Sequence, residues 1–127
     1  MQRQTAILIL GDQLSWHHPA LIHADPDEVV IVMAEVMEEA TYVRHNRHKI
    51  ALLFSAMRHF AQALRAKGFG VAYYDLDASL PTLLAACEQA VREWQCEVLQ
   101  ICEPGEHRLM AQMPDWSDAL GLPVQLL

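Results

Sequence analysis

The sequence predicts an α/β protein built on an open, parallel, five-stranded sheet, Rossmann-like or flavodoxin-like, with helices on both faces. Short apolar runs such as Thr5 to Leu10 (TAILIL) are typical of strands buried on both faces of a parallel sheet. Segments with helical periodicity separate these runs, which is the βαβ alternation of such sheets. The chain has 127 residues, 53% of them hydrophobic, so we expect a single domain at residues 1–127.

The five predicted strands are short apolar or β-branched runs bounded by turn residues. They cover residues 5–10, 28–34, 69–76, 97–102 and 123–127.

The longest predicted helix has apolar residues at spacings of three, four and seven, which places them on one face. This face consists of Ile50, Leu53, Phe54, Met57, Phe60, Ala61 and Leu64. The helix should end at Lys67 and Gly68, because glycine readily adopts a left-handed cap. A second helix carries an inner face of Leu83, Leu84, Cys87, Val91 and Trp94. Short helices are predicted at 107–113 and at 115–120, the second ending at Gly121.

Composition excludes several classes of function for this chain. A net charge of -7 and a pI near 5.4 argue against a surface that binds nucleic-acid phosphates. Cys87, Cys96 and Cys102 lack a CxxC spacing, so they are interpreted as reduced thiols of a cytoplasmic protein. No apolar run approaches the length of a membrane span, and the N-terminus does not resemble a signal peptide.

Polar residues follow three of the predicted strands. Gly11, Asp12 and Gln13 follow the first strand, Glu35, Glu38 and Glu39 the second, and Glu103 and Glu106 the fourth. Ligands of open α/β sheets bind beyond the carboxyl ends of the strands, so these groups are candidates for one site. The alternative interpretation is that the charged stretch from Glu35 to Lys49 is an ordinary solvated connection.

These side chains suit a flat, neutral ligand that forms hydrogen bonds. Asp12, Glu35 and Glu39 could accept hydrogen bonds from ring N–H or hydroxyl groups, and Gln13 could donate or accept. The helix near Leu53 could supply an apolar wall. No nucleophile elbow, P-loop or ligand spacing for a metal is present, so we predict neither catalytic residues nor a metal site in this chain.

Three motifs in the chain resemble a known family. They are ILGDQL (Ile9 to Leu14), AEVMEEATYVRHNRHKIALLFSAMRHFAQALR (Ala34 to Arg65) and CEPGEHR (Cys102 to Arg108). They resemble the N-terminal domain of the bacterial photolyase–cryptochrome family that carries an iron–sulfur cluster, the prokaryotic (6-4) photolyases or deoxyribodipyrimidine photolyase-related proteins. The resemblance covers essentially the whole chain, and the long central motif is its most specific part.

The resemblance implies an α/β antenna domain that binds 6,7-dimethyl-8-ribityllumazine, which passes excitation to FAD. Matching positions place nine residues against this chromophore: Gly11, Asp12, Gln13, Leu14, Glu35, Val36, Glu39, Leu53 and Glu103. The family's C-terminal helical domain, with FAD, a 4Fe-4S cluster and the DNA-lesion site, is absent from this chain. We therefore expect a truncated protein or a short reading frame that is not catalytic alone, contacts damaged DNA only through the helical domain, and could form a homodimer when isolated.

Two alternatives remain at this point. The chain could be a stand-alone α/β nucleotide- or flavin-binding protein. It could also be a structural domain with an empty pocket, whose surface packs against the helical domain.

Overall fold

The computed structural model describes residues 4–9, 14, 16, 19–22, 24–35, 47–75, 82–101 and 116–126, with only the main chain at 19–20, 47–50 and 126. Its elements are β1 (Thr5–Leu8), α1 (Pro19–Ile22), β2 (Val29–Ala34), α3 (Arg47–Ala66), β3 (Gly70–Tyr74), α4 (Leu83–Trp94), β4 (Val98–Ile101), α6 (Trp116–Leu120) and β5 (Val124–Leu126). The predicted helix at 107–113 lies outside the described residues.

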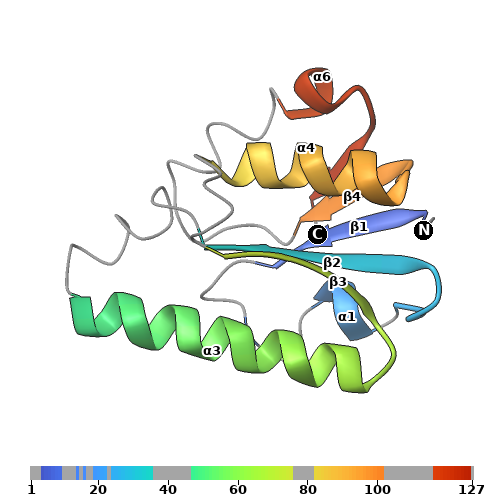
Figure 1. Cartoon of the computed structure of the whole chain (residues 1–127). Coiled ribbons are helices and arrows are strands. Elements are labelled where there is room, and N and C mark those ends of the chain that lie inside the picture. Colours follow the sequence, from blue (N-terminus) through green and yellow to red (C-terminus); the bar gives the residue numbers. More distant parts are fainter. Residues whose placement is uncertain are drawn as a thin grey trace.

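The five strands form one parallel sheet in the order β3-β2-β1-β4-β5 (Figure 1). The predicted open parallel α/β fold is therefore confirmed. The sequence left a Rossmann-like and a flavodoxin-like sheet open. The observed order is the Rossmann one, in which the chain returns to the centre of the sheet after β3. The switch point lies between β1 and β4, which pair with each other.

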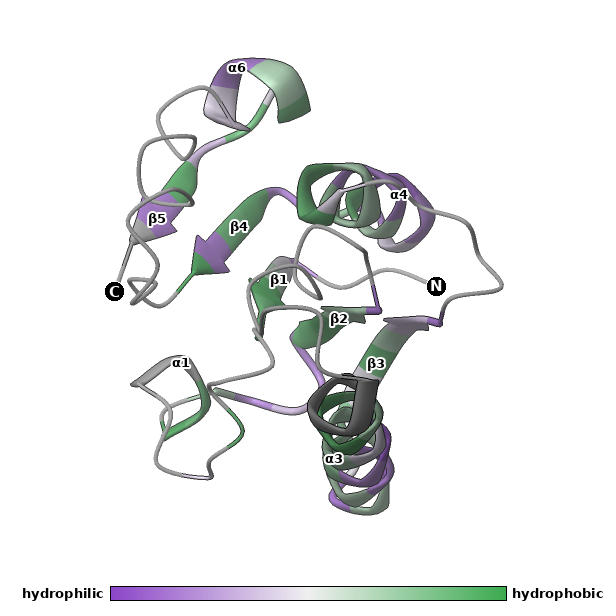
Figure 2. Ribbon diagram, turned by 90° about the vertical axis from the view of Figure 1, so that its left-hand side faces the viewer, coloured by the Kyte–Doolittle hydropathy of each residue, from purple (hydrophilic) through white to green (hydrophobic). Residues whose placement is uncertain are grey.

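Helices cover both faces of the sheet. Figures 1 and 2 show α1 and α3 on one face and α4 and α6 on the other. The α3-side cluster comprises the buried residues Ile7, Ile9, Leu21, Val29, Ile31, Met33, Phe54, Met57, Ala61, Leu64 and Val71. The α4-side cluster comprises Ala6, Leu8, Val30, Val32, Ala34, Ala72, Tyr74, Leu83, Ala86, Cys87, Ala90, Leu99, Ile101 and Trp116. Strand β2 is buried along its whole length, as its apolar sequence predicted.

Helix α3 buries the face that the sequence pattern predicted. Phe54, Met57, Ala61 and Leu64 are buried in the α3-side cluster, and Leu53 and Phe60 pack against it. The helix ends in a Schellman motif, because the N–H of Phe69 donates to the carbonyl of Leu64 and that of Gly68 to the carbonyl of Arg65. Gly68 has a φ of 93°, as its predicted role as a left-handed cap requires.

Helix α4 is fixed by its own caps. The hydroxyl of Thr82 accepts a hydrogen bond from the N–H of Ala85 at 3.1 Å, and Gln95 adopts the left-handed conformation at the other end. Of its predicted inner face, Leu83 and Cys87 are buried, and the other three residues pack against the α4-side cluster. In the described part of the chain, no helix is long and apolar enough to cross a membrane.

Both described cysteines are shielded from solvent, Cys87 fully and Cys96 in part. Burial raises the pKa of the Cys96 thiol from 9.0 to about 11 and raises that of the fully buried Cys87 further. A rise of two pKa units makes the thiolate fraction near pH 8 about a hundredfold smaller.

We therefore expect a Cys102→Ser chain to react with a thiol reagent at least about tenfold more slowly when folded than in urea. The measurement is the rate of reaction with Ellman's reagent near pH 8, with the urea-unfolded chain as the control. Equal rates in the two states would contradict the burial of these thiols.

Candidate functional site

The structure describes three of the nine predicted site residues. These are Leu14, Glu35 and Leu53. The remaining predictions fall outside the described residues, at Gly11, Asp12, Gln13, Val36, Glu39 and Glu103.

Leu14 and Leu53 lie on the same side of the sheet. Both are partly buried and pack against the α3-side cluster, Leu14 from the segment after β1 and Leu53 from the first half of α3. Two residues 39 positions apart in the sequence thus contribute apolar surface to the same side of the sheet. Such a surface can contact the face of a flat ring.

Glu35 is the buried charged residue of the described chain, with only 2% of its surface exposed. It directly follows β2, and its N–H continues the ladder to β3 by donating to the carbonyl of Tyr74 at 2.7 Å. Because side chains alternate along a strand, Glu35 shares the α3 face of the sheet with Ile31 and Met33. A carboxylate in this position requires compensating partners.

Arg58 and Tyr73 supply these partners, and we call the three residues the Glu35 clamp. Arg58 donates from Nε to Oε2 of Glu35 at 2.6 Å and from Nη2 to Oε1 at 2.7 Å, a bidentate ion pair. The hydroxyl of Tyr73 donates to Oε2 at 2.5 Å. The clamp therefore joins the end of β2, the middle of α3 and β3.

The two donors of the clamp, Arg58 and Tyr73, are protonated near neutral pH. The hydrogen bond and charge of Glu35 raise the pKa of Arg58. Burial, followed by the hydrogen bond to Glu35, raises the pKa of Tyr73. Both donors thus keep their protons throughout the physiological range.

These contacts bear on the predicted role of Glu35 as a ligand acceptor. A carboxylate offers about four lone-pair sites, and three hydrogen bonds from Arg58 and Tyr73 already occupy most of that capacity. The sequence-based role of Glu35 stays a prediction. What the structure adds is a role in fixing the end of β2.

Sequence reasoning missed Arg58 and Tyr73, because it assigned a site role to neither residue and Arg58 is not among the residues of the predicted apolar face. A signal was nevertheless present. The alternation of side chains along a strand puts Glu35 on the same face as Met33, and a carboxylate at the end of a strand this apolar needs a cation. Arg58 and Arg65 each follow a core residue, Met57 or Leu64, on the helix that covers the same face, so both were candidates for that cation.

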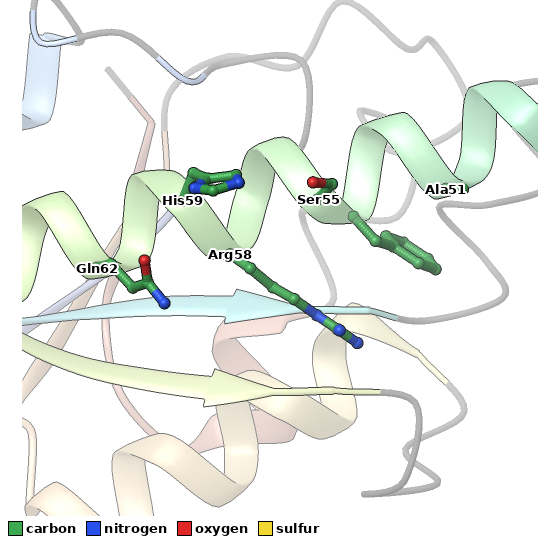
Figure 3. Close-up of a pocket in the computed structure, with 6 residues that line it drawn as sticks. Ala51, Ser55, Arg58, His59 and Gln62 are labelled. Atoms are coloured by element: carbon green, nitrogen blue, oxygen red, sulfur yellow. The ribbon is translucent and has the colours of Figure 1, made fainter.

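Two cavities meet along the flank of α3 that carries Arg58. The larger one, of about 440 Å³, is lined by Ala51, Phe54, Ser55, Arg58, His59 and Gln62 (Figure 3). The smaller one, of about 240 Å³, is lined by Arg58, Ala61, Gln62, Arg65, Tyr73 and Asp75. Figure 3 shows Arg58 reaching from α3 toward the strands, in agreement with its ion pair.

The clamp and the apolar surface lie on different flanks of α3. Leu53 and Arg58 are five residues apart, which corresponds to about 140° around a helix. Leu14 and Leu53 thus pack against the same hydrophobic cluster, whereas Glu35 is engaged on the flank of α3 that carries Arg58. Among the described residues, no three His, Cys, Asp or Glu side chains are grouped so as to hold a metal ion.

Comparison with known proteins identifies a family and a relative of this chain. The sequence profile of the family described as deoxyribodipyrimidine photo-lyase-related protein matches residues 7–127. A (6-4) photolyase from Agrobacterium fabrum (strain C58 / ATCC 33970) is 39% identical over 122 residues. The aligned region covers 94% of this chain and 24% of that protein, so the chain spans about a quarter of its relative's length.

Proposed function

Because this chain belongs to the deoxyribodipyrimidine photo-lyase-related protein family, we propose that it is the antenna domain of a light-dependent DNA-repair protein and binds 6,7-dimethyl-8-ribityllumazine. The observation that carries the proposal is the similarity to a (6-4) photolyase across 94% of the chain. The family membership confirms the resemblance that the three sequence motifs indicated.

The described residues fit one part of such a ligand. Leu14 and Leu53 provide an apolar surface on the α3 side of the sheet, which suits the face of a bicyclic ring. In our proposal, hydrogen bonds to ring and ribityl groups come from Asp12, Gln13 and Glu39. The Glu35 clamp supports this site by fixing the end of β2, from which the chain continues toward Glu39.

The role of this chain's residues is to bind and orient the chromophore. When bound, the lumazine supplies absorption of light and passes excitation to FAD. We propose that FAD, the 4Fe-4S cluster and the contacts to damaged DNA belong to a C-terminal helical domain. The relative is about four times longer than the aligned region, which leaves room for such a domain. The net charge of -7 agrees with a domain that does not itself bind DNA.

The test is a fluorescence-polarisation titration of the lumazine with the parent chain and with two tryptophan variants. We expect Leu53→Trp to raise the Kd about tenfold or more, because a bulky indole disrupts the apolar surface. Leu52→Trp is the matched control. Leu52 is the neighbouring residue on α3 but is 69% exposed, so its replacement should leave the Kd unchanged.

FAD serves as the second ligand in the same titration. Saturable binding of lumazine without binding of FAD would support an antenna site in this chain. Saturable binding of FAD alone would favour a stand-alone flavin-binding protein instead. Equal lumazine affinity in the two tryptophan variants would contradict the proposed position of the ring.

A further inference from the structure

Strand β3 forms one edge of the sheet, and half of its main-chain groups point away from β2. Tyr74 directs its carbonyl to β2, where it accepts a hydrogen bond from Glu35. Successive residues of a strand direct their N–H and C=O groups to opposite sides, so Val71 and Tyr73 direct theirs outward. The guanidinium of Arg65 confirms this, because its Nη2 donates to the carbonyl of Val71 from outside the sheet at 3.3 Å.

The side chains beside this edge carry opposite charges at its two ends. Arg65 lies against Val71 near the start of β3, and Asp75 directly follows β3 at its other end. Both are exposed, and both line the cavity of about 240 Å³ beside the strand. Arg58, the other cation of this cavity, is already paired with Glu35.

We propose that this edge binds a second copy of the chain, with the two β3 strands antiparallel about a two-fold axis at Ala72. In this register, Val71 lies opposite Tyr73 of the second copy, and Tyr73 lies opposite its Val71. These are the residues whose main-chain groups point outward, so each pair can exchange two N–H···O bonds. Ala72, whose groups point to β2, forms the non-hydrogen-bonded pair at the axis.

The charge pattern matches the same register. The start of one β3 strand meets the end of the other, so Arg65 of each copy faces Asp75 of the other. Pairing gives the carbonyl of Val71 a main-chain donor in place of the Arg65 side chain. The guanidinium is thereby released to reach the carboxylate of the second copy. The two copies each carry a net charge of -7, so these two local pairs offset a general repulsion.

This proposal is independent of the proposed chromophore site, because it uses the edge of β3 and not the surface at Leu14 and Leu53. A charge swap tests it by sedimentation velocity over a concentration series. We expect the parent chain to dimerise, and Arg65→Asp and Asp75→Arg each to raise the dimer Kd about tenfold or more. An equimolar mixture of these two variants should form a heterodimer with a Kd within about threefold of the parent value, because each Asp–Arg pair is restored.

Asp118→Arg is the matched control. It makes the same change of charge at an exposed residue of α6, away from the β3 edge, and should leave the dimer Kd unchanged. Thermal melts establish that each variant is folded. A parent chain that stays monomeric at every concentration, or a variant mixture that stays monomeric, would overturn the proposal. Equal weakening by Asp118→Arg and Asp75→Arg would overturn it as well.

Discussion

An Arg58→Met chain is expected to melt about 10 °C or more below the parent chain. The side chain of Glu35 has no exposed surface, whereas that of Arg58 is 57% exposed. Removing the guanidinium therefore leaves a carboxylate in the interior without its compensating charge, and desolvation of that charge dominates the cost. Methionine retains much of the packing of the arginine stem, so the effect reports the lost charge. Thermal melts followed by circular dichroism measure it.

Two further variants separate the clamp from a general effect of arginine. Arg65→Met, two turns later on the same flank of α3, removes one hydrogen bond to a carbonyl at 3.3 Å and should change the Tm by only about 1–3 °C. Adding Glu35→Gln to Arg58→Met should recover part of the lost stability, because a neutral amide needs no counter-charge. Equal Tm values for Arg58→Met and Arg65→Met would mean that the Glu35 clamp contributes no more to the stability of the fold than the single hydrogen bond of Arg65.

A Leu64→Ala chain is expected to lose about 2–5 kcal/mol of unfolding free energy. Leu64 has no exposed surface and packs among Phe54, Met57 and Ala61 in the α3-side cluster. Its removal leaves a cavity in the interior, and the surrounding helix and sheet can collapse into it only in part. Urea unfolding with linear extrapolation gives the change in free energy.

Leu52→Ala provides the control for this measurement. It makes the same substitution on the same helix at a residue that is 69% exposed, and should cost no more than about 0.5 kcal/mol. Comparable losses in the two variants would mean that helix propensity, and not burial, determines the effect.

Much of the fold could be predicted because burial determines the local pattern. The apolar run of β2 and the spacing of Met57, Ala61 and Leu64 in α3 each lead to the observed element. Element ends were less accurate. The first strand was predicted to reach Leu10 but ends at Leu8, although Ile9 is buried and donates to the carbonyl of Val32. The apolar run indicates which residues are buried, and burial continues at Ile9 although the regular strand has ended. The predicted strand was therefore too long.

The sequence could not predict the order of the strands or the partners of Glu35. Every strand of a doubly covered sheet has a similar apolar sequence, so the Rossmann and flavodoxin orders produce the same local pattern. The clamp depends on a side-chain contact across 23 residues, between Glu35 and Arg58. Periodicity indicates which face of a helix or strand is buried. It does not indicate which polar residue at the margin of that face forms an ion pair with a neighbouring element.

The Glu35 clamp also bears on how β2 finds its alignment with β3. A strand that is apolar on both faces can slide by one residue and still bury every side chain, so its hydrophobic pattern specifies the pairing weakly. Such a slip would turn Glu35 toward the α4 face, where Arg92 is exposed and paired with Glu88. The carboxylate is compensated by Arg58 and Tyr73 only when Met33 lies beside Tyr73 and Ala34 beside Tyr74. One charged residue thus selects a single alignment for two strands whose apolar residues would accept several.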